Sequence, residues 1–406
     1  MHIGPHPSAV PSGAPRKPRQ LTLCHVVAAF PGLSETFIAN EIRALRDLGH
    51  TVIPAVIAPD AGPMLPVDQA LREDAVRLAD VETMQALNHA ATNPAGLAAA
   101  VDFAHRQRGT PRRALLRAAA RLAFTARTRG CTHIHAYFAE AAAVAICAAR
   151  IAGITASFAG HGRQAGGHDG ELALQLAATD LAIAVDAHMA AAFRRLAPQA
   201  NLCTIPPGVA PDRFRPSPGR SNGRLLAIGE LVPQKGFHAL LIALSYLHPL
   251  LRPQVDVVGT GPLEQELVAS AGDLGLAETV NFLGPRPSGW IVTEGPQYQG
   301  MVCPDVIDQN GVRDNGLIAI KEAMAMGLPI VASALPGVRE VVDADCARLA
   351  PPGDVPALAE GLVWLAGLEP RARTSLGANG RARVQERFTL RQQAMRLAAA
   401  FADLRP

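Results

Sequence analysis

Short apolar runs alternate with helix-forming segments along most of the chain, and this alternation restricts the possible folds more than any other feature. The first series opens with an apolar run at 21–29 and a helical segment at 38–48 that ends at Gly49. An apolar run at 51–58 then completes a strand–helix–strand unit. Runs that are short and apolar throughout are typical of parallel strands buried on both faces. The sequence therefore predicts an α/β fold built on doubly wound parallel sheets.

The alternation occurs in two series, which predicts two domains. In the first series we expect further strands at 133–138, 155–159 and 181–185, and helices at 140–151 and 188–196. In the second series we expect strands at 225–229, 255–258, 280–283, 300–303 and 330–332, and helices at 236–247, 264–273 and 356–365. A proline-rich stretch at 206–218 joins the two series, and an amphipathic helix is expected at 390–404. The prediction is two Rossmann-like domains that face each other across a cleft.

Length and composition agree with two domains and exclude several classes of function. The 406 residues are enough for two domains of about 200 residues each, and 49% of them are hydrophobic. No run of about 18 apolar residues predicts a membrane span, and a net charge of +3 with 4% aromatic residues argues against nucleic-acid binding. Residues 1–20 lack an apolar segment, so we expect a flexible tail and not a signal peptide. The six scattered cysteines include no C-x-x-C pair, which is typical of reduced thiols in the cytosol.

The most informative motif is the segment 313–333, in which a loop turns into a helix between two carboxylates. Seven residues separate Asp314 from Glu322, and the helix start between them, at Leu317 and Ile318, offers backbone N–H groups. Such amides suit a phosphate, and the flanking carboxylates accept hydrogen bonds from sugar hydroxyls. The segment therefore predicts a nucleotide-sugar site. The alternative is an ordinary helix start with acidic residues in its first turns.

This segment resembles the motif of the retaining family-4 glycosyltransferases of GT-B fold, in which a Glu, seven residues and a second Glu precede Ala-Met-Ala. Asp314 stands in place of the first Glu, which keeps the charge and shortens the reach by one methylene. The Ser-Glu-Thr-Phe sequence at 34–37 resembles a branch of this family whose members make bacterial exopolysaccharides. The resemblance extends from Leu21 to about Phe388.

The resemblance implies a division of the chain into an acceptor domain, a nucleotide-sugar domain and a helix that returns to the first domain. The expected boundaries are a tail at 1–20, an acceptor-binding domain at 21–212, a donor-binding domain at 213–388 and the returning helix at 389–406.

A lysine near the start of the second domain is a candidate phosphate ligand. Lys235 lies at the mouth of an expected helix, where its ammonium group can hold a pyrophosphate as a point charge. The family pattern is Gly-Arg, four residues and Lys-Gly, so Lys235 fits but Glu230 stands where an Arg is usual. A carboxylate cannot clamp a diphosphate. Either another Arg replaces it or Glu230 binds a hydroxyl, and the alternative for Lys235 is a solvated surface lysine.

Two glycines follow the second strand of the same domain. Alone, Gly259 and Gly261 would equally suggest a nicotinamide cofactor, but the third glycine of the dinucleotide fingerprint is absent because position 264 is Glu. With their neighbours they resemble the family's Val-Gly-x-Gly-Pro run. They either let the backbone approach the nucleotide closely or allow a tight turn.

The first domain contributes two further candidate residues. His161 lies between two glycines after an expected strand, at the sheet edge where ligands bind. It resembles the family's Phe-Thr-Ala-His segment, whose His contacts the donor sugar, so the resemblance implies catalytic roles for His161 and Asp314. Gly32, just before the expected helix cap at Ser34, is placed against the donor phosphate. The alternatives are a structural His and simple helix capping.

Two patterns that suggest metal ligands are interpreted as structural. The D-x-D sequence at 343–345 matches the metal site of a different glycosyltransferase fold, but here we expect a loop and no metal. His133 and His135 share one face of a strand without a third ligand nearby in the sequence. No metal site and no cofactor other than the nucleotide sugar as co-substrate are predicted.

Arginines at every fourth position predict one basic helical face at Arg113, Arg117 and Arg121. Such a face can rest on anionic lipid, or it can simply be solvated. We therefore expect a cytoplasmic protein, with or without peripheral contact to the inner face of the membrane.

The resemblance implies metal-independent transfer of a sugar from a UDP- or GDP-sugar to an acceptor, with retention at the anomeric carbon. The acceptor is either a lipid-linked saccharide or a small natural product. A rival interpretation is a nucleotide-sugar-binding protein without turnover, because Glu230 and Asp314 both depart from the family pattern. A weaker rival is an NAD-dependent oxidoreductase, which rests on Gly259 and Gly261 alone.

Overall fold

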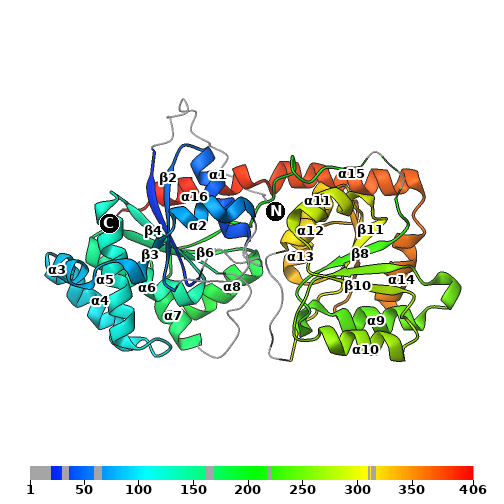
Figure 1. The fold of residues 1–406 in the computed structure, drawn as a ribbon, viewed down its shortest axis with the longest axis horizontal. Helices are drawn as coiled ribbons and strands as arrows, with labels where there is room; N and C mark the ends of the chain where they lie inside the picture. The colour runs from blue at the N-terminus through cyan, green and yellow to red at the C-terminus, as the bar shows by residue number, and fades with distance from the viewer. Residues whose placement is uncertain are drawn as a thin grey trace, which may run out of the picture.

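Two parallel sheets lie side by side in the computed structural model, each covered by helices (Figure 1). The structure describes residues 20–29, 36–58, 66–160, 169–217, 219, 221–309, 311 and 317–405. The part of the chain that forms the first sheet and its helices is called the N-terminal unit, and the part that forms the second is called the C-terminal unit.

The N-terminal unit has a seven-stranded sheet, within the described residues, in the order β3-β2-β1-β4-β5-β6-β7. Its strands are β1 (Thr22–Val27), β2 (Thr51–Val56), β3 (Val76–Arg77), β4 (His133–Tyr137), β5 (Thr155–Ala159), β6 (Leu181–Ala184) and β7 (Leu202–Thr204). Its helices are α1 (Thr36–Asp47), α2 (Gln69–Asp74), α3 (Thr83–Ala91), α4 (Pro94–Arg106), α5 (Arg112–Thr128), α6 (Phe138–Ala152), α7 (Asp169–Ala178) and α8 (Ala187–Leu196).

The C-terminal unit has a six-stranded sheet, again counted over the described ranges, in the order β10-β9-β8-β11-β12-β13. Its strands are β8 (Leu225–Ile228), β9 (Val255–Val258), β10 (Val280–Gly284), β11 (Gly300–Cys303), β12 (Ile330–Ser333) and β13 (Ala347–Ala350). The helices that follow are α9 (Phe237–Tyr246), α10 (Glu264–Asp273), α11 (Ser288–Glu294), α12 (Ile318–Ala325), α13 (Pro336–Val341), α14 (Val355–Ala366), α15 (Pro370–Arg387) and α16 (Leu390–Ala402).

Both faces of the first sheet are buried, which explains why its strands are apolar throughout. On β1, Cys24 and Val26 pack in the core formed with α4, α5 and α6. The alternate residues Leu23 and Val27 pack in a second core with α1 and α16. The predicted pair of doubly wound parallel sheets is therefore confirmed.

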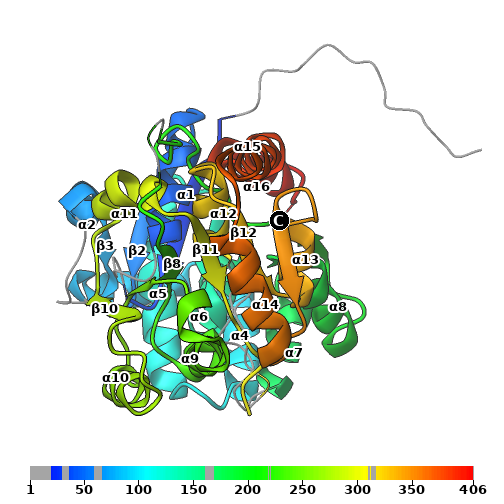
Figure 2. The ribbon, with the colours of Figure 1, turned by 90° about the vertical axis from the view of Figure 1, so that its right-hand side faces the viewer.

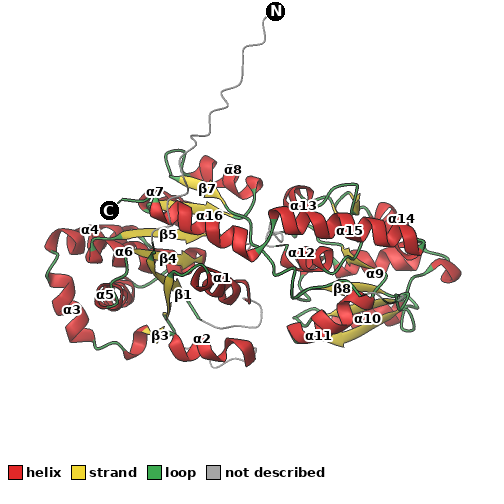
Figure 3. Ribbon diagram, turned by 90° about the horizontal axis from the view of Figure 1, so that it is seen from above, coloured by secondary structure: helices red, strands yellow, loops and turns green. Residues whose placement is uncertain are grey.

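The last two helices connect the two units. Figure 3 shows α15 lying over the C-terminal unit and α16 over the N-terminal unit, and both are nearly end-on in the view along the long axis (Figure 2). Leu397 and Phe401 of α16 are buried in the core of the N-terminal unit. The chain thus crosses twice between the units, and the crossings touch at a parallel bridge between Val209 and Thr389. A Cβ atom at Gly208 would lie 2.5 Å from the Thr389 carbonyl oxygen, so only glycine allows this approach.

Helix α15 and strand β13 were not predicted. Helix α15 has no apolar stripe, because its buried residues are Gly377, Gly380 and Val384. It packs through backbone instead, since a Cβ atom at Gly377 would lie 1.9 Å from the carbonyl oxygen of Gly327. None of the helices within the described ranges is long and apolar enough to cross a bilayer.

Candidate active site at the domain interface

The start of α12 lies beyond β11, at the carboxyl end of the second sheet, and has the geometry of an anion site. Leu317 precedes the helix in the left-handed region, with φ at +48°, which is unusual for a residue other than glycine. The first N–H groups of an α-helix lack an intrahelical acceptor, and in α12 this turn starts at Ile318. The predicted helix start is therefore present, and its amides and dipole favour a phosphate.

Glu322 lies one turn into this helix and is half-buried. Burial raises the pKa of its carboxyl to about 7, and the nearby Arg213 guanidinium lowers it in part. Near neutral pH this carboxyl is divided between its two protonation states. A hydroxyl-rich ligand such as ribose would shift it to the ionised form by donating hydrogen bonds.

Lys235 is an ion-paired lysine and not a solvated one. Its Nζ lies 3.2 Å from Oδ1 of Asp305, whose side chain is buried at the end of β11. The stem of Lys235 covers Gly229, because a Cβ atom there would lie 3.1 Å from the Lys235 Cδ. Since β8 and β11 are neighbours in the sheet, the pair places a cation beside the loop that leads to α12.

The two glycines after β9 are required by packing against the loop after β8. A Cβ atom at Gly259 would lie 1.8 Å from the carbonyl oxygen of Gly229, and one at Gly261 would lie 2.6 Å from that of Leu231. Packing against this loop is thus a reason for both glycines that the sequence does not predict, and the two interpretations from the sequence, close approach to the nucleotide or a tight turn, stay predictions. Glu230, at the tip of the same loop, is exposed.

The structure places two further charged residues at this site, Asp305 and Arg213, which no sequence motif marks. Asp305 lies two residues after the end of β11, and this position near a strand end is the signal in the sequence. The guanidinium of Arg213 acts on Glu322 and donates a hydrogen bond to Ser288 Oγ. Arg213 lies in the segment that joins the two units, and no sequence pattern predicts that it acts on a residue of α12.

Three of the predicted site residues, Gly32, His161 and Asp314, lie outside the described residues. Their roles stay predictions.

The D-x-D sequence lies in a turn between α13 and β13, so the predicted loop is confirmed. Asp343 forms an ion pair with Arg383, whose Nη1 lies 2.8 Å from its Oδ2. Over the part of the chain that the structure describes, no group of three or more His, Cys, Asp or Glu side chains is placed to hold a metal ion.

His133 and His135 bind hydroxyl groups of the neighbouring strand. His133 Nδ1 lies 2.7 Å from Thr155 Oγ1, and His135 Nδ1 lies 2.7 Å from Ser157 Oγ. Burial lowers the pKa of His133 to about 3, so it is neutral at physiological pH. The structural interpretation of this pair agrees with these contacts.

The predicted basic face of α5 is only partly correct. Arg113 and Arg117 are exposed, but Arg121 is half-buried and donates a hydrogen bond to Thr83 Oγ1 of α3 at 2.7 Å. The exposed stripe therefore ends at Arg117, because α3 covers the next turn.

The second sheet and the helix start described above lie in a part of the chain that matches a known protein family. Residues 222–367, which include the whole second sheet and α12, match the family described as glycosyl transferases group 1. This part of the chain thus has the sequence pattern of the group 1 glycosyltransferases. The predicted recognition of family 4 is therefore confirmed.

Curated proteins that are similar in sequence to this chain carry the names of glycosyltransferases. Two share 32% identity with about half of the chain: MMP α-(1→4)-mannosyltransferase of Mycolicibacterium hassiacum and GDP-mannose-dependent α-(1-6)-phosphatidylinositol monomannoside mannosyltransferase of Mycolicibacterium smegmatis. The alignments include 50% of this chain in each case, and 48% and 56% of the relatives. A putative colanic acid biosynthesis glycosyltransferase, WcaL of Escherichia coli, is 26% identical over 47% of this chain and 48% of its own. The chain thus spans about half the length of the curated relatives it matches.

Solved structures show that the whole described architecture is the GT-B fold. Sucrose-phosphate synthase from Thermosynechococcus elongatus superposes with a TM-score of 0.72 over 94% of this chain and 98% of its own, at 18% identity. Anabaena Alr3699/HepE in complex with UDP superposes with a TM-score of 0.70 over 95% of this chain and 100% of its own, at 19% identity. The predicted GT-B fold is confirmed.

Proposed function

We propose that this protein transfers a sugar from a nucleotide-sugar donor to an acceptor, with retention of the anomeric configuration and without a catalytic metal ion. The match to this family supports glycosyl transfer. The observation that carries the proposal is the placement of Lys235 and the start of α12 at neighbouring strand ends of the matched sheet. A diphosphate needs such a combination of a cation and unpaired amides.

In the proposed reaction the bond between the anomeric carbon and the diphosphate oxygen breaks, and a bond from the acceptor oxygen to the same carbon forms. Negative charge builds up on the diphosphate, where Lys235 and the first amides of α12 stabilise it. The acceptor attacks on the face that the diphosphate leaves, and its proton passes to the departing diphosphate oxygen. Attack on that face gives retention.

We assign the remaining predicted residues to the donor. Glu322 binds the ribose, while Asp314 and His161 bind hydroxyls of the donor sugar next to the anomeric carbon. Gly32 lies against the donor phosphate when the units close around it.

Arg213 supplies the second positive charge that Glu230 cannot. This assignment is supported by the electrostatic effect of Arg213 on Glu322, the residue that we propose binds the ribose. Gly259 and Gly261 contribute by holding the loop at 229–231 in place, so that Lys235 approaches the diphosphate correctly.

The choice of donor is narrowed by the relatives. The name of the M. smegmatis relative specifies GDP-mannose, and the HepE structure contains UDP. We propose a GDP- or UDP-hexose as donor, and a lipid-linked saccharide or a small natural product as acceptor.

Release of nucleotide from a panel of UDP- and GDP-sugars, without acceptor, tests this function. Slow release of GDP or UDP from one donor supports a glycosyltransferase. Tight binding of a nucleotide sugar without release would identify a binding protein instead. Turnover that requires NAD would support the oxidoreductase interpretation.

Activity should survive EDTA, because we propose that lysine and backbone amides, and not a metal ion, neutralise the diphosphate. The measurement is the rate of nucleotide release with EDTA and after addition of Mg²⁺ or Mn²⁺. A complete loss that either metal restores would contradict the metal-independent mechanism.

If the acceptor is lipid-linked, we expect binding to anionic vesicles that weakens with salt. Replacing Arg113 and Arg117 by serine should reduce co-sedimentation with such vesicles. The control replaces Arg194 and Arg195 of α8, which are also exposed and carry the same charge. Equal loss in both double variants, or equal binding to neutral vesicles, would contradict a role for α5.

A further inference from the structure

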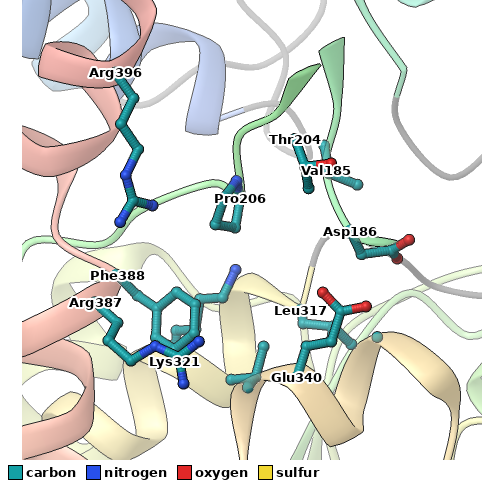
Figure 4. A pocket seen from close by; sticks show the side chains of 12 residues that line it. Val185, Asp186, Thr204, Pro206, Leu317, Lys321, Glu340, Arg387, Phe388 and Arg396 are labelled. Carbon is teal, nitrogen blue, oxygen red and sulfur yellow. The ribbon is translucent and has the colours of Figure 1, made fainter. Parts of the chain in front are cut away.

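A pocket of about 210 Å³ lies between the two units, on the side where the chain crosses from one to the other (Figure 4). On the side of the N-terminal unit its walls come from the ends of β6 and β7 and from α16. On the side of the C-terminal unit they come from α12, α13 and the end of α15. The residues that line it include Asp186, Lys321, Gly337, Glu340, Arg387 and Arg396. It adjoins the start of α12 through Leu317, but it includes neither Lys235 nor Glu322.

One side of the pocket carries two arginines that form no ion pair with any described residue. Arg387 and Arg396 come from different helices and are exposed at the mouth. Within the described ranges neither guanidinium forms a hydrogen bond or an ion pair. Arg387 lies over the ring of Phe388, 5.4 Å from its centroid, and its charge acts to lower the pKa of Glu340 across the pocket. Guanidinium groups donate charge-assisted hydrogen bonds that match phosphate oxygens, so two of them on one side of a pocket favour a phosphate there.

A buried lysine forms the floor beneath these arginines. Lys321 is 1% exposed, and its Nζ donates a hydrogen bond to the carbonyl of Pro207 at 2.9 Å. The ammonium also lies 5.3 Å from the Phe388 ring. Three positive charges thus surround this side of the pocket, which increases its attraction for an anion.

The opposite side carries two carboxylates, as Figure 4 shows. Glu340 is half-buried, and its two oxygens lie 3.0 and 3.2 Å from the N–H of Ala187, which donates to them from the start of α8. Asp186 is buried beside it and accepts a hydrogen bond from the N–H of Met189 at 2.6 Å. A carboxylate held in this way has lone pairs left for a ligand hydroxyl. Gly337 keeps this side open, since a Cβ atom there would lie 3.0 Å from an oxygen of Asp186.

We propose that this pocket binds a phosphorylated carbohydrate other than the donor nucleotide, with its phosphate on Arg387 and Arg396 and a hydroxyl on Glu340. The pocket is smaller than those that hold drug-sized ligands, which suits one sugar ring with its phosphate. Because both units line it, the bound ligand stabilises the arrangement of the units seen here. The free sugar phosphate and a lipid headgroup that joins phosphate to a polyol ring share this chemistry.

Calorimetric titration of the full chain with glucose 6-phosphate, mannose 6-phosphate and inorganic phosphate tests the proposal without requiring turnover. We expect the double variant R387S/R396S to bind the sugar phosphates at least about tenfold more weakly, since each arginine contributes a charge-assisted contact. The control R371S/R391S removes two exposed arginines from the same two helices, outside the pocket, and should bind like the parent protein. The affinity for GDP should not change in either variant.

A second variant tests the hydroxyl contact. E340Q keeps the shape of the side chain, so it should lower the affinity for sugar phosphates relative to inorganic phosphate. Vesicles that contain phosphatidylinositol form a further arm: binding that R387S/R396S abolishes would identify a lipid headgroup as the source of the phosphate.

The proposal is overturned if neither the sugar phosphates nor these vesicles bind the parent protein. It is also overturned if R387S/R396S and R371S/R391S lose equal affinity. A parallel loss of GDP affinity in R387S/R396S would assign the arginines to the donor site. These outcomes differ from a failure of the proposed function, which would appear as an absence of nucleotide release.

Discussion

Replacing Lys235 by alanine should lower turnover on the order of 10- to 100-fold. The variant removes a cation from the departing diphosphate, and a charge-assisted contact of this kind contributes about 1.5–3 kcal/mol. The measurement is kcat/KM for nucleotide release from the active donor, together with the unfolding temperature of the variant.

The ion pair with Asp305 provides the control. Removing Lys235 alone leaves a buried carboxylate without its cation, which destabilises the fold as well as the site. The double variant K235A/D305N removes both charges and should recover the unfolding temperature. If Lys235 acts on the diphosphate, turnover stays low in the double variant. Recovery of turnover together with stability would show that Lys235 only neutralises Asp305.

Glu322→Ala should weaken the binding of GDP or UDP on the order of 10- to 100-fold, because a ribose hydroxyl loses a charged acceptor. In contrast, Asp314→Ala and His161→Ala should leave nucleotide affinity nearly unchanged and abolish turnover, because we assign both side chains to the donor sugar. Calorimetric titration of the three variants with GDP and UDP separates these roles. Equal loss of nucleotide affinity in all three, or in none, would refute the assignment.

The raised pKa of Glu322, about 7, adds a pH dependence to this prediction. The carboxyl is mostly protonated at pH 6 and mostly ionised at pH 8, and only the ionised form is a strong acceptor for ribose. Nucleotide affinity should therefore rise between these pH values in the parent protein and rise less in Glu322→Gln. For the unliganded protein the sign is opposite: a folded pKa above the ordinary 4.5 contributes stability below pH 4.5 that is lost as the pH rises through 7.

The regular elements could be predicted where local pattern and burial agree. Strands β5, β9 and β11 and helix α10 have the predicted bounds, because each apolar run or amphipathic segment is delimited by glycine, proline or polar residues. Helix α15 could not be predicted, since its contact with Gly327 depends on glycine and not on a hydrophobic stripe. Local pattern cannot show which segments approach through bare backbone.

Charged residues show the same difference between what local pattern predicts and what tertiary packing decides. The motif around Lys235 predicts its position, but its partner Asp305 lies seventy positions away, after a different strand. The spacing of the arginines on α5 predicts an exposed Arg121, yet α3 covers it through Thr83. Periodicity identifies the face of a helix, but the neighbour that covers that face is set by tertiary packing.

The most direct test of glycosyl transfer with retention is proton NMR of the donor with the protein and no acceptor. The spectra follow the anomeric signals of the sugar as it is released and before it mutarotates. We predict release of the nucleoside diphosphate with a sugar that first appears in the donor's own anomeric configuration. An inverted sugar as the first product, or tight nucleotide binding with no release from any donor, would contradict the proposed reaction.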